Sequence, residues 1–382
     1  MSSGSKAIII GGGPGGLAAA IALRRAGFDT VVYERGGQRL EVGSGLTLWP
    51  NAMKALGSLA IAEAVWSVSL PTAGIAMRSW RGELLFDIKP ANPSEASSDL
   101  YGAALQRAEL LNVFLEALGE GVVKFGARYT GYSQDDRNVT AFFEDGSQAR
   151  GSILVGADGI GSLIRGQMLG NTKLRYAGFT VWRGVAEFKL SQNVGVTTMG
   201  RGAQFGLFPM RGNKVYWFAS ANAPEGERGP STGTKGELIE RFGDWHEPIK
   251  EVIESTNQSC IIRTDIYDHD PLTRWSEGRV TLLGDAAHAA TPNLGQGACQ
   301  AIEDAVVLAT CLGEAPDVVA ALKAYESRRM KRTSAITMQS RRLGQMGRWK
   351  NPLACWIRDR LIKSTPDRVR LQQLGDMFRF EA

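Results

Sequence analysis

The feature that most constrains this chain is a run of five glycines and one proline between two apolar segments near its start. Residues 7–10 are apolar, as in a buried strand, and residues 17–26 have the alanine-rich character of a helix. A second short strand is predicted over residues 30–33 and ends at Glu34. Strand, glycine-rich turn, helix and strand form a βαβ unit, so the sequence predicts a parallel sheet with both faces covered.

The glycine run also has the GxGxxG spacing, through Gly11, Gly13 and Gly16. In that motif the first glycine permits a tight turn, the second admits a pyrophosphate close to the backbone, and the third allows close helix–sheet packing. The phosphate then lies at the helix N-terminus. Glu34 follows at the distance where a carboxylate accepts hydrogen bonds from an adenosine ribose. The unit predicts a bound dinucleotide, which is either NAD or FAD.

Two later segments repeat the strand–turn–helix pattern. Residues 152–156 lead through an Ala-Asp-Gly turn into a helical segment at 162–168. Residues 279–283 lead through Gly-Asp and a loop into a helix from about residue 295 to 312. The sequence therefore predicts at least three strands of one parallel sheet.

The last of these units distinguishes between the two cofactors. Its strand delivers Asp285 to its carboxyl end, the edge at which open α/β sheets bind ligands. Pro292 stiffens the following loop, and Gly295 and Gly297 open a helix whose amides can approach a ligand closely. A helix N-terminus favours negative charge, and reduced flavin carries such a charge on its pyrimidine edge. The unit favours FAD, although an ordinary βα crossover with a flexible turn also explains the pattern.

Composition excludes several other classes of protein. Four cysteines without CxxC spacing suit a reducing, cytoplasmic setting. Three histidines, far apart in sequence, argue against a histidine metal site, so no metal is predicted. The net charge of +5 is small, and no nucleic-acid-binding motif is present. The glycines interrupt the apolar start, unlike a signal peptide, and no segment is apolar for long enough to cross a bilayer.

Between these strand–turn–helix units the pattern of residue types changes. Residues 174–222 contain aromatic and β-branched runs separated by glycine and asparagine turns, and residues 206–218 have the pattern of a hairpin. We therefore predict an α/β fold, with an FAD-binding, Rossmann-like parallel-sheet domain, an inserted antiparallel-sheet substrate domain and C-terminal helices. The expected FAD-binding domain comprises residues 1–70, 106–172 and 276–382, with the C-terminal helices from about residue 318. The expected substrate domain comprises residues 71–105 and 173–275.

Three motifs occur in the order found in a known enzyme family: GGGPGG at residues 11–16, GADGIGS at 156–162, and GDAAH at 284–288 continuing to residue 298. On these motifs the chain resembles the class A flavin-dependent aromatic hydroxylases of the para-hydroxybenzoate hydroxylase fold, over nearly its whole length. It most resembles the branch with urate, salicylate and hydroxybenzoate hydroxylases and zeaxanthin-epoxidase-like proteins. The resemblance implies FAD as cofactor, NADH or NADPH as a transient reductant, and O₂ as co-substrate.

The resemblance also implies which residues contact the cofactor. Asp158 and Gly159 would serve both FAD and NAD(P)H, and Asp285 would bind the ribityl or pyrophosphate region. Arg107 would reach the FAD, and backbone near Tyr129 would meet the adenine. The full expected set is Gly11, Gly13, Gly15, Gly16, Glu34, Arg35, Thr47, Arg107, Tyr129, Asp158, Gly159, Asp285, Pro292, Gly295, Gln296, Gly297 and Ala298.

Candidate substrate contacts lie in the expected inserted sheet. Tyr216 is the candidate catalytic residue, because similar hydroxylases place a tyrosine of this strand beside the bound ring, where its phenol could help deprotonate a substrate hydroxyl. Arg183 could pair with an anionic substrate, and Phe208 could line an apolar pocket. Core packing or an exposed structural arginine would also explain these residues. Urate-type relatives carry an arginine on the preceding strand, where this chain has Gln204 and a displaced Arg201, which argues against urate.

The C-terminal part has a helical and basic pattern. Residues 328–350 contain many basic residues and no acidic one, and an amphipathic segment with tryptophan and leucine follows. Such helices can lie on an anionic membrane, which would suit a lipophilic substrate. They can equally cover the flavin domain with their charges in solvent. Peripheral membrane contact is therefore one of two expectations for this region.

These patterns together predict a single-component FAD-dependent monooxygenase that consumes NAD(P)H. It would hydroxylate a small phenolic or heteroaromatic substrate through a flavin C4a-hydroperoxide. One alternative is epoxidation of a polyene or another lipophilic substrate, and another is a flavin-binding protein whose redox state regulates a partner. The expected setting is cytoplasmic, as a monomer or homodimer, without a nucleic acid partner.

Overall fold

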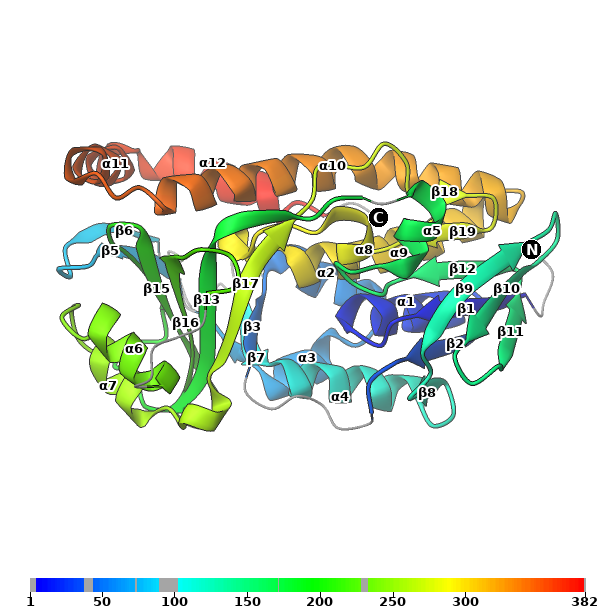
Figure 1. Cartoon of the computed structure of the whole chain (residues 1–382), viewed down its shortest axis with the longest axis horizontal. Coiled ribbons are helices and arrows are strands. Elements are labelled where there is room, and N and C mark those ends of the chain that lie inside the picture. Colours follow the sequence, from blue (N-terminus) through cyan, green and yellow to red (C-terminus); the bar gives the residue numbers. More distant parts are fainter. Residues whose placement is uncertain are drawn as a thin grey trace.

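Two large sheets lie side by side, and the C-terminal helices run along both of them (Figure 1). The computed structural model describes residues 5–37, 44–72, 74–88, 102–170, 172–227 and 233–380. Residues 89–101, which fall in the expected substrate domain, lie outside the described residues. The predicted fold class is confirmed: a parallel sheet with helices, additional antiparallel sheets and C-terminal helices.

The parallel sheet forms around the apolar N-terminal strand. Its strands are β1 (Lys6–Ile10), β2 (Asp29–Glu34), β8 (Val123–Phe125), β12 (Ile153–Gly156), β18 (Ser276–Glu277) and β19 (Val280–Leu282). The order across the sheet is β18-β19-β12-β1-β2-β8. All described pairs are parallel except the edge pair of β18 and β19. The four strands predicted at residues 7–10, 30–33, 152–156 and 279–283 therefore lie side by side, with their carboxyl ends at one edge.

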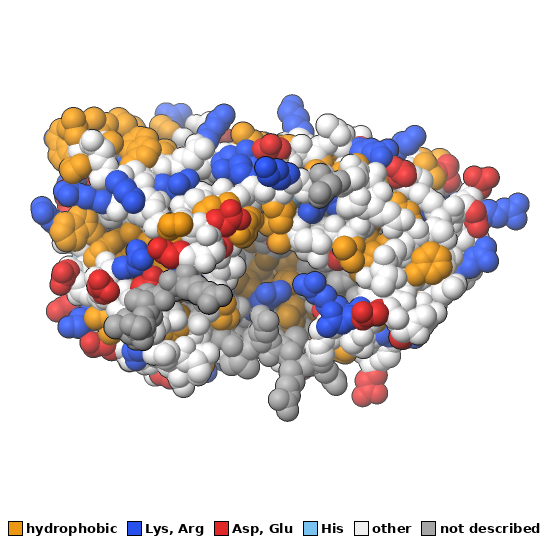
Figure 2. Space-filling view, viewed as in Figure 1, with side chains coloured by type: hydrophobic (Ala, Val, Ile, Leu, Met, Phe, Trp, Pro, Cys, Tyr) orange, Lys and Arg blue, Asp and Glu red, His pale blue; other side chains and the backbone are white. Residues whose placement is uncertain are grey.

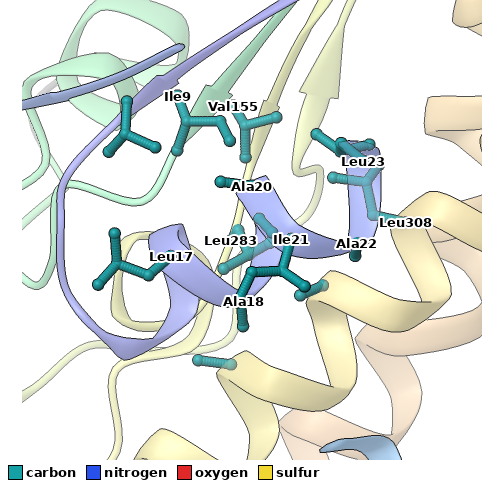
Figure 3. Packing of buried hydrophobic residues seen from close by; sticks show 14 of the residues in the cluster. Ile9, Leu17, Ala18, Ala20, Ile21, Ala22, Leu23, Val155, Leu283 and Leu308 are labelled. Carbon is teal, nitrogen blue, oxygen red and sulfur yellow. The ribbon is translucent and has the colours of Figure 1, made fainter. Parts of the chain in front are cut away.

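Helices cover one face of this sheet. Helix α1 (Pro14–Arg25) packs against α4 (Arg107–Leu118) and α9 (Gly297–Glu314). Small side chains make the close approach to α9 feasible, and Figure 3 shows Ala18 and Ala22 of α1 on that side, with Leu308 of α9 nearby. On the other face lie three antiparallel strands, β9 (Tyr129–Gln134), β10 (Val139–Phe143) and β11 (Gln148–Gly151).

The second large sheet has seven strands in the order β17-β13-β16-β15-β14-β5-β6. Their bounds are β5 (Ile75–Ser79), β6 (Leu84–Ile88), β13 (Arg175–Glu187), β14 (Gly195–Met199), β15 (Ala203–Met210), β16 (Lys214–Asn222) and β17 (Ile262–Asp268). The predicted hairpin is β15 and β16, which pair antiparallel. One face buries Trp182, Phe205 and Trp217 against α6 (Gly233–Phe242) and α7 (Ile249–Ser255). The alternate residues of each strand therefore face the rest of the molecule.

A small sheet connects the two large ones. It contains β3 (Gly45–Leu48), β4 (Leu70–Pro71) and β7 (Ala103–Gln106), in the order β3-β7-β4. Helices α2 (Pro50–Ser58) and α3 (Ala62–Val68) follow β3, and α2 packs on α9. Strand β3 also contacts β13 and β16 of the seven-stranded sheet. The connecting sheet thus brings the N-terminal part of the chain to the inner face of the large antiparallel sheet.

Three helices complete the chain: α10 (Val318–Gly347), α11 (Pro352–Ser364) and α12 (Asp367–Phe378). Helix α10 packs on α9, and α11 contacts β6. Several arginines of the basic segment turn inward; Arg341, for example, pairs with Asp268 and Asp270. Within the described ranges, no helix has the length and apolar character needed to span a bilayer.

Candidate active site

The glycine-rich turn before α1 is tightly packed on its inner side. A Cβ at Gly11, where φ is +112°, would lie 2.2 Å from the carbonyl oxygen of Ala157, and a Cβ at Gly16 would lie 1.9 Å from the carbonyl oxygen of Gly11. At Gly13, in contrast, the nearest atom to a Cβ is Nη2 of Arg107, at 4.0 Å. The first amides of α1 have no acceptor within the helix. Gly13, these amides and Arg107 therefore form a cradle suited to an anionic group.

The carboxylate of Glu34, at the end of β2, lies against the same turn. Its Oε2 accepts a hydrogen bond from the Gly12 amide at 2.6 Å, and its Oε1 accepts one from the Gly36 amide at 2.7 Å. A carboxylate oxygen can accept more than one hydrogen bond, so both oxygens retain capacity for ribose hydroxyls. Arg35 follows on an exposed edge, whereas Tyr129 is buried at the start of β9.

Asp158 lies in the turn between β12 and α5 (Leu163–Leu169). Its Oδ2 accepts a hydrogen bond from the Leu163 amide at 2.9 Å, which helps to cap the helix. Burial raises the pKa of Asp158, although hydrogen bonds from Ser162 and from backbone amides oppose the shift. Its Oδ1 is buried and lacks a partner among the described residues. The next residue, Gly159, has φ of +79°, a conformation that favours glycine.

A second helix N-terminus is formed by the unit that begins at Asp285. This residue starts the short helix α8 (Asp285–His288) at the carboxyl end of β19, as predicted. Pro292 then opens a 3₁₀ turn that ends at Gly295, whose φ of +62° is left-handed. Helix α9 therefore begins at Gly297, two residues later than predicted, because the left-handed glycine interrupts the helical path. Oδ1 of Asp285 lies 3.8 Å from a Cβ placed at Gly297.

The two helix N-termini lie beside each other. A Cβ at Gly15 of α1 would lie 2.9 Å from the Cβ of Ala301 in α9 and 2.8 Å from the side chain of Leu283. Ala298, in the first turn of α9, lines a cavity together with Gly297. The predicted cofactor residues of the first and last motifs therefore converge, although they are more than 250 positions apart in sequence.

Gln296 differs from its neighbours in this loop because its side chain points into the protein. Its Oε1 accepts hydrogen bonds from Nδ2 of Asn51 at 3.0 Å and from Nε2 of Gln300 at 2.9 Å. The Asn51 amide also donates to Glu303 at 2.6 Å. Only the backbone of Gln296 is therefore available to a ligand, and its side chain fixes the loop to α2 and α9.

A buried ionic cluster lies behind the loop. Oδ2 of Asp304 accepts hydrogen bonds from the Gly284 amide at 3.0 Å and pairs with Nε2 of His288 at 2.6 Å. Its Oδ1 accepts from Nε of Arg329 at 2.6 Å. Burial opposes ionisation of Asp304, but the charges of His288 and Arg329 outweigh it and lower the pKa of Asp304 to about 2. The cluster joins the α8 motif to α9 and α10, and His288 has a structural role within it.

A cavity of about 1090 Å³ separates this loop from the seven-stranded sheet. Figure 2 shows a hollow in the middle of the surface, with apolar side chains inside it. Thr47 of β3, the loop from Pro292 to Gly295, and residues of the sheet line the cavity. Three predicted substrate contacts are among the sheet residues: Arg183, Phe208 and Tyr216. The structure therefore brings the predicted cofactor and substrate residues to a common space.

Tyr216 is held at the centre of this sheet face. Its ring lies 6.1 Å from that of Phe208, centroid to centroid, and a Cβ at Gly45 would lie 2.4 Å from its Cγ. Burial raises the pKa of the Tyr216 phenol, while the charge of Arg183 and a hydrogen bond from it act in the opposite direction. The phenol is therefore protonated at neutral pH and available as a hydrogen-bond donor.

Two further observations test whether these residues fit a flavin dinucleotide. Nε1 of Trp49 is buried without a hydrogen-bond partner among the described residues, and it lies 2.9 Å from a Cβ placed at Gly295. The cradle for an anionic group at Gly13 belongs to α1, whose Gly15 packs against Ala301 of α9, and the N-terminus of α9 lines the cavity. A pyrophosphate at the first end and a flat polar ring at the second match these features. The fold and the site thus define a flavin-binding oxidoreductase.

Comparison with known proteins agrees with this class. The profile of the FAD binding domain family matches residues 5–340. An aurachin C monooxygenase/isomerase of Stigmatella aurantiaca is 40% identical over 375 residues, which cover 97% of both chains. An FAD-dependent urate hydroxylase of Klebsiella pneumoniae is 35% identical over 344 residues, which cover 88% of this chain and 89% of the hydroxylase. A structure of Klebsiella pneumoniae HpxO with FAD and uric acid has a TM-score of 0.91 at 31% identity, covering 98% of this chain and 96% of that one.

The chain therefore belongs to the FAD binding domain family. It is an FAD-dependent monooxygenase of the aromatic-hydroxylase type, so the predicted resemblance, enzyme class and cofactor are confirmed. FAD, with NADH or NADPH as reductant and O₂ as co-substrate, is the standard set of this family.

Sequence reasoning missed several residues that shape the site. Gly45 and Trp49 follow no motif, yet the first allows Tyr216 to pack against β3 and the second contacts the α9 loop. Phe378 of α12 stacks on Trp49 with ring centroids 5.3 Å apart. The only sequence signal for the ionic cluster was a run of acidic residues, Glu303 and Asp304, inside an otherwise apolar helix.

Proposed function

We propose that this monooxygenase hydroxylates a phenolic or hydroxylated heteroaromatic ring, held between Tyr216 and the N-terminus of α9. The observation that carries the proposal is the Tyr216–Arg183 pair on the cavity wall, opposite the loop from Pro292 to Gly297. Bound FAD would supply the activated oxygen. The protein would supply orientation and a largely apolar cavity that excludes water.

In this proposal the side chains of the sheet polarise the substrate. The Tyr216 phenol would donate a hydrogen bond to the hydroxyl oxygen attached to the aromatic ring of the substrate. This hydrogen bond favours the deprotonated, electron-rich form of the substrate. Arg183, behind the phenol, would stabilise the negative charge that develops on that oxygen. Phe208, whose ring lies beside that of Tyr216, would pack against the aromatic ring of the substrate and fix its orientation.

The cofactor residues would hold FAD in an extended form, with its adenosine end near Glu34 and its flavin end near Thr47. The turn with Gly11, Gly13, Gly15 and Gly16 would receive the pyrophosphate, together with Arg107. Asp158 and Asp285 would face the sugar and ribityl hydroxyls, and the amides of α9 would face the flavin ring. In this assignment the parallel-sheet segments form an FAD-binding domain, and the segments of the seven-stranded sheet form a substrate domain.

The uncharged side chain of Gln204 argues for a substrate other than urate. Gln204 of β15 lines the cavity at the position where urate-type relatives were expected to carry an arginine. Its amide contacts the end of α10, since a Cβ at Gly347 would lie 1.9 Å from Nε2 of Gln204. An uncharged side chain fixed in this way would not neutralise an anionic purine.

A direct experiment tests the function. NADH or NADPH oxidation by the purified holoenzyme is measured with and without each member of a panel of phenols and hydroxylated heteroaromatics. A productive ring should raise the rate at least tenfold, and its product should gain one oxygen atom. The apolar residues of the cavity would also suit a polyene, which is the substrate of the alternative epoxidase function. If no aromatic compound changes the rate of NAD(P)H oxidation while a polyene raises it, the enzyme is an epoxidase. Indifference to both substrate classes would favour a redox regulator.

We also infer that the enzyme makes peripheral contact with anionic membranes through α11. Leu353, Trp356 and Leu361 are 64%, 59% and 60% exposed, and their spacing places them on one helix face. Arg360 lies over the Trp356 ring at 5.7 Å. Figure 2 shows a large apolar patch where Figure 1 places this helix. We infer a cytoplasmic setting, which four free cysteines support, and a monomer or homodimer.

A further inference from the structure

The cavity is longer than a single aromatic ring. On the inner face of the seven-stranded sheet, the register aligns Tyr216 of β16, Phe208 of β15, Gly195 of β14 and Ile75 of β5 in one row. This row crosses three strand spacings, which corresponds to about 14 Å. The Phe208 ring lies over Gly195 and occupies the place of its side chain, so Phe208 forms the floor of the cavity between Tyr216 and Ile75. A ring beside Tyr216 would leave the Ile75 end of the cavity free.

Helix α12 forms the opposite wall of this end. Leu374, Met377 and Phe378 line the cavity, and their i, i+3 and i+4 spacing places them on one face of the helix. The helix is fixed at both ends: Phe378 stacks on Trp49 beside the α9 loop, and the Arg370 guanidinium lies 4.9 Å from the centroid of Phe86 in β6. It therefore runs from the expected flavin position to the edge of the sheet.

The two ends of the cavity differ in polarity. At the β5–β6 edge the lining side chains are apolar apart from Thr197: Ile75, Ala76, Met77, Phe86, Leu374 and Met377. At the opposite edge, beyond Arg183, Arg263 pairs with Glu227, and Asp265 accepts a hydrogen bond from the Gly226 amide. These polar groups pair with one another, and Nε of Arg263 is in addition buried without a partner among the described residues. The apolar end offers only van der Waals contact and exclusion of water.

From this arrangement we propose a subsite for an unbranched aliphatic chain, bounded by β5, β6 and α12. The proposal rests on the proposed function, because the chain would be a substituent of the ring held by Tyr216. The chain would extend from the ring past Phe208 and Gly195 to Ile75 and Leu374. Leu371, on the same face of α12 and exposed, marks the direction in which a longer chain would leave the cavity. The substrate class is therefore a hydroxyaromatic compound with an unbranched alkyl chain.

The test uses a series of 4-alkylphenols whose chains run from methyl to nonyl. Binding to the oxidised holoenzyme is followed through the flavin absorbance spectrum, so that it is measured even where turnover is slow. Each methylene that enters the subsite should lower the dissociation constant by up to about fourfold. The decrease should stop once the chain exceeds the subsite. A dissociation constant that is independent of chain length, with methylphenol bound, would refute the subsite and leave the proposed function intact.

A pair of variants locates the effect. Leu374→Gln places a polar group in the apolar wall, whereas Val369→Gln makes the same change on α12 outside the cavity lining, where the side chain is 40% exposed. Leu374→Gln should weaken nonylphenol binding at least tenfold and leave methylphenol binding within twofold, and Val369→Gln should change neither. Equal loss for both ligands in Leu374→Gln would contradict a chain subsite. Failure of all phenols to bind would instead contradict the proposed function.

Discussion

At the scale of single residues, the site depends on what each side chain can donate at neutral pH. The pKa of the Tyr216 phenol is raised by burial, so the free enzyme presents a neutral donor rather than a phenolate. Arg183 beside it remains the positive charge of the pair. A hydrogen bond from this neutral phenol would stabilise a deprotonated substrate oxygen, so Tyr216 would assist deprotonation, as expected from the sequence, without itself acting as the base.

Tyr216→Phe tests this role. It removes one hydrogen bond to a substrate oxygen that becomes charged, and such bonds contribute about 1.5–3 kcal/mol, so kcat/KM for the ring substrate should fall roughly 10- to 100-fold. FAD content should not change. Steady-state kinetics and the flavin spectrum measure both quantities. Unchanged kcat/KM in a variant with full FAD content would show that Tyr216 only fills space.

The cradle before α1 allows a second test with a matched control. Gly13→Ala adds a methyl group on the open side, where only Arg107 lies within 4.0 Å, so the apoprotein should fold normally. The methyl would occupy the space of the pyrophosphate, and FAD affinity should fall at least tenfold. Gly57→Ala, in α2 with no atom near its Cβ, is the control and should retain FAD. Equal FAD affinity in the two variants would place the pyrophosphate elsewhere.

At the scale of elements, the ionic cluster joins the three helices α8, α9 and α10. Asp304 of α9 bridges His288 of α8 and Arg329 of α10, and all three side chains are buried. A buried charge is stable only when its partners are in place, so the cluster fixes the position of the loop that carries Asp285.

Asp304→Asn should lower the free energy of unfolding by about 3–5 kcal/mol, because it leaves Arg329 buried and incompletely paired. The pKa of Asp304 is lowered from 3.8 to about 2, so the carboxylate stabilises the fold above pH 3.8. That contribution is lost as the pH falls towards 2. Urea denaturation at several pH values measures the difference between variant and wild type. A difference that grows on acidification would contradict the assignment.

The elements also show what the sequence could and could not predict. Local patterns located β1, α1, β2, the β15–β16 hairpin and α9, because alternation, glycine turns and helix starts are properties of neighbouring residues. The packing of Gly45 against Tyr216 joins residues 171 positions apart, and no local pattern encodes it. The inward turn of the Gln296 side chain had no sequence signal either, since loop glutamines usually face solvent.

The basic C-terminal segment shows the same limit. The sequence predicted that its charges face either an anionic membrane or solvent, but Arg329 is buried, Arg341 pairs with Asp268, and Arg348 bonds to Asn222. The partners come from distant segments of the chain, so the sequence alone could not identify them. The exposed apolar face belongs to α11, which contains the amphipathic segment identified from the sequence.

At the scale of the whole molecule, exposed large apolar side chains gather at one end. Among the residues that the structure describes, eight of ten such side chains lie between Leu343 and Leu371, and Leu84 of β6 lies near them, because α11 contacts β6. Such a concentration is typical of an interaction surface. The patch adjoins α12, the wall of the proposed chain subsite, so a lipophilic substrate could pass from a membrane to the cavity over a short path.

Vesicle binding tests this surface. Wild-type enzyme should sediment with vesicles rich in anionic lipid, and the double variant Trp356→Ser, Leu361→Ser should bind at least tenfold more weakly. Leu163→Ser is the control, because Leu163 on α5 is 57% exposed and far from the patch in sequence and in the fold. If the wild-type enzyme does not bind vesicles and is a dimer, whereas the double variant is a monomer, the patch is a subunit interface.

In the proposed reaction, a ring held by Tyr216 receives one atom of O₂ from the reduced cofactor. The most direct measurement is turnover of the stimulating ring compound under isotopically labelled O₂, with the product analysed by mass spectrometry. We expect one labelled oxygen atom per product molecule and matching consumption of NAD(P)H. Product oxygen derived from water, or NAD(P)H consumption that yields only hydrogen peroxide with every ring tested, would contradict it.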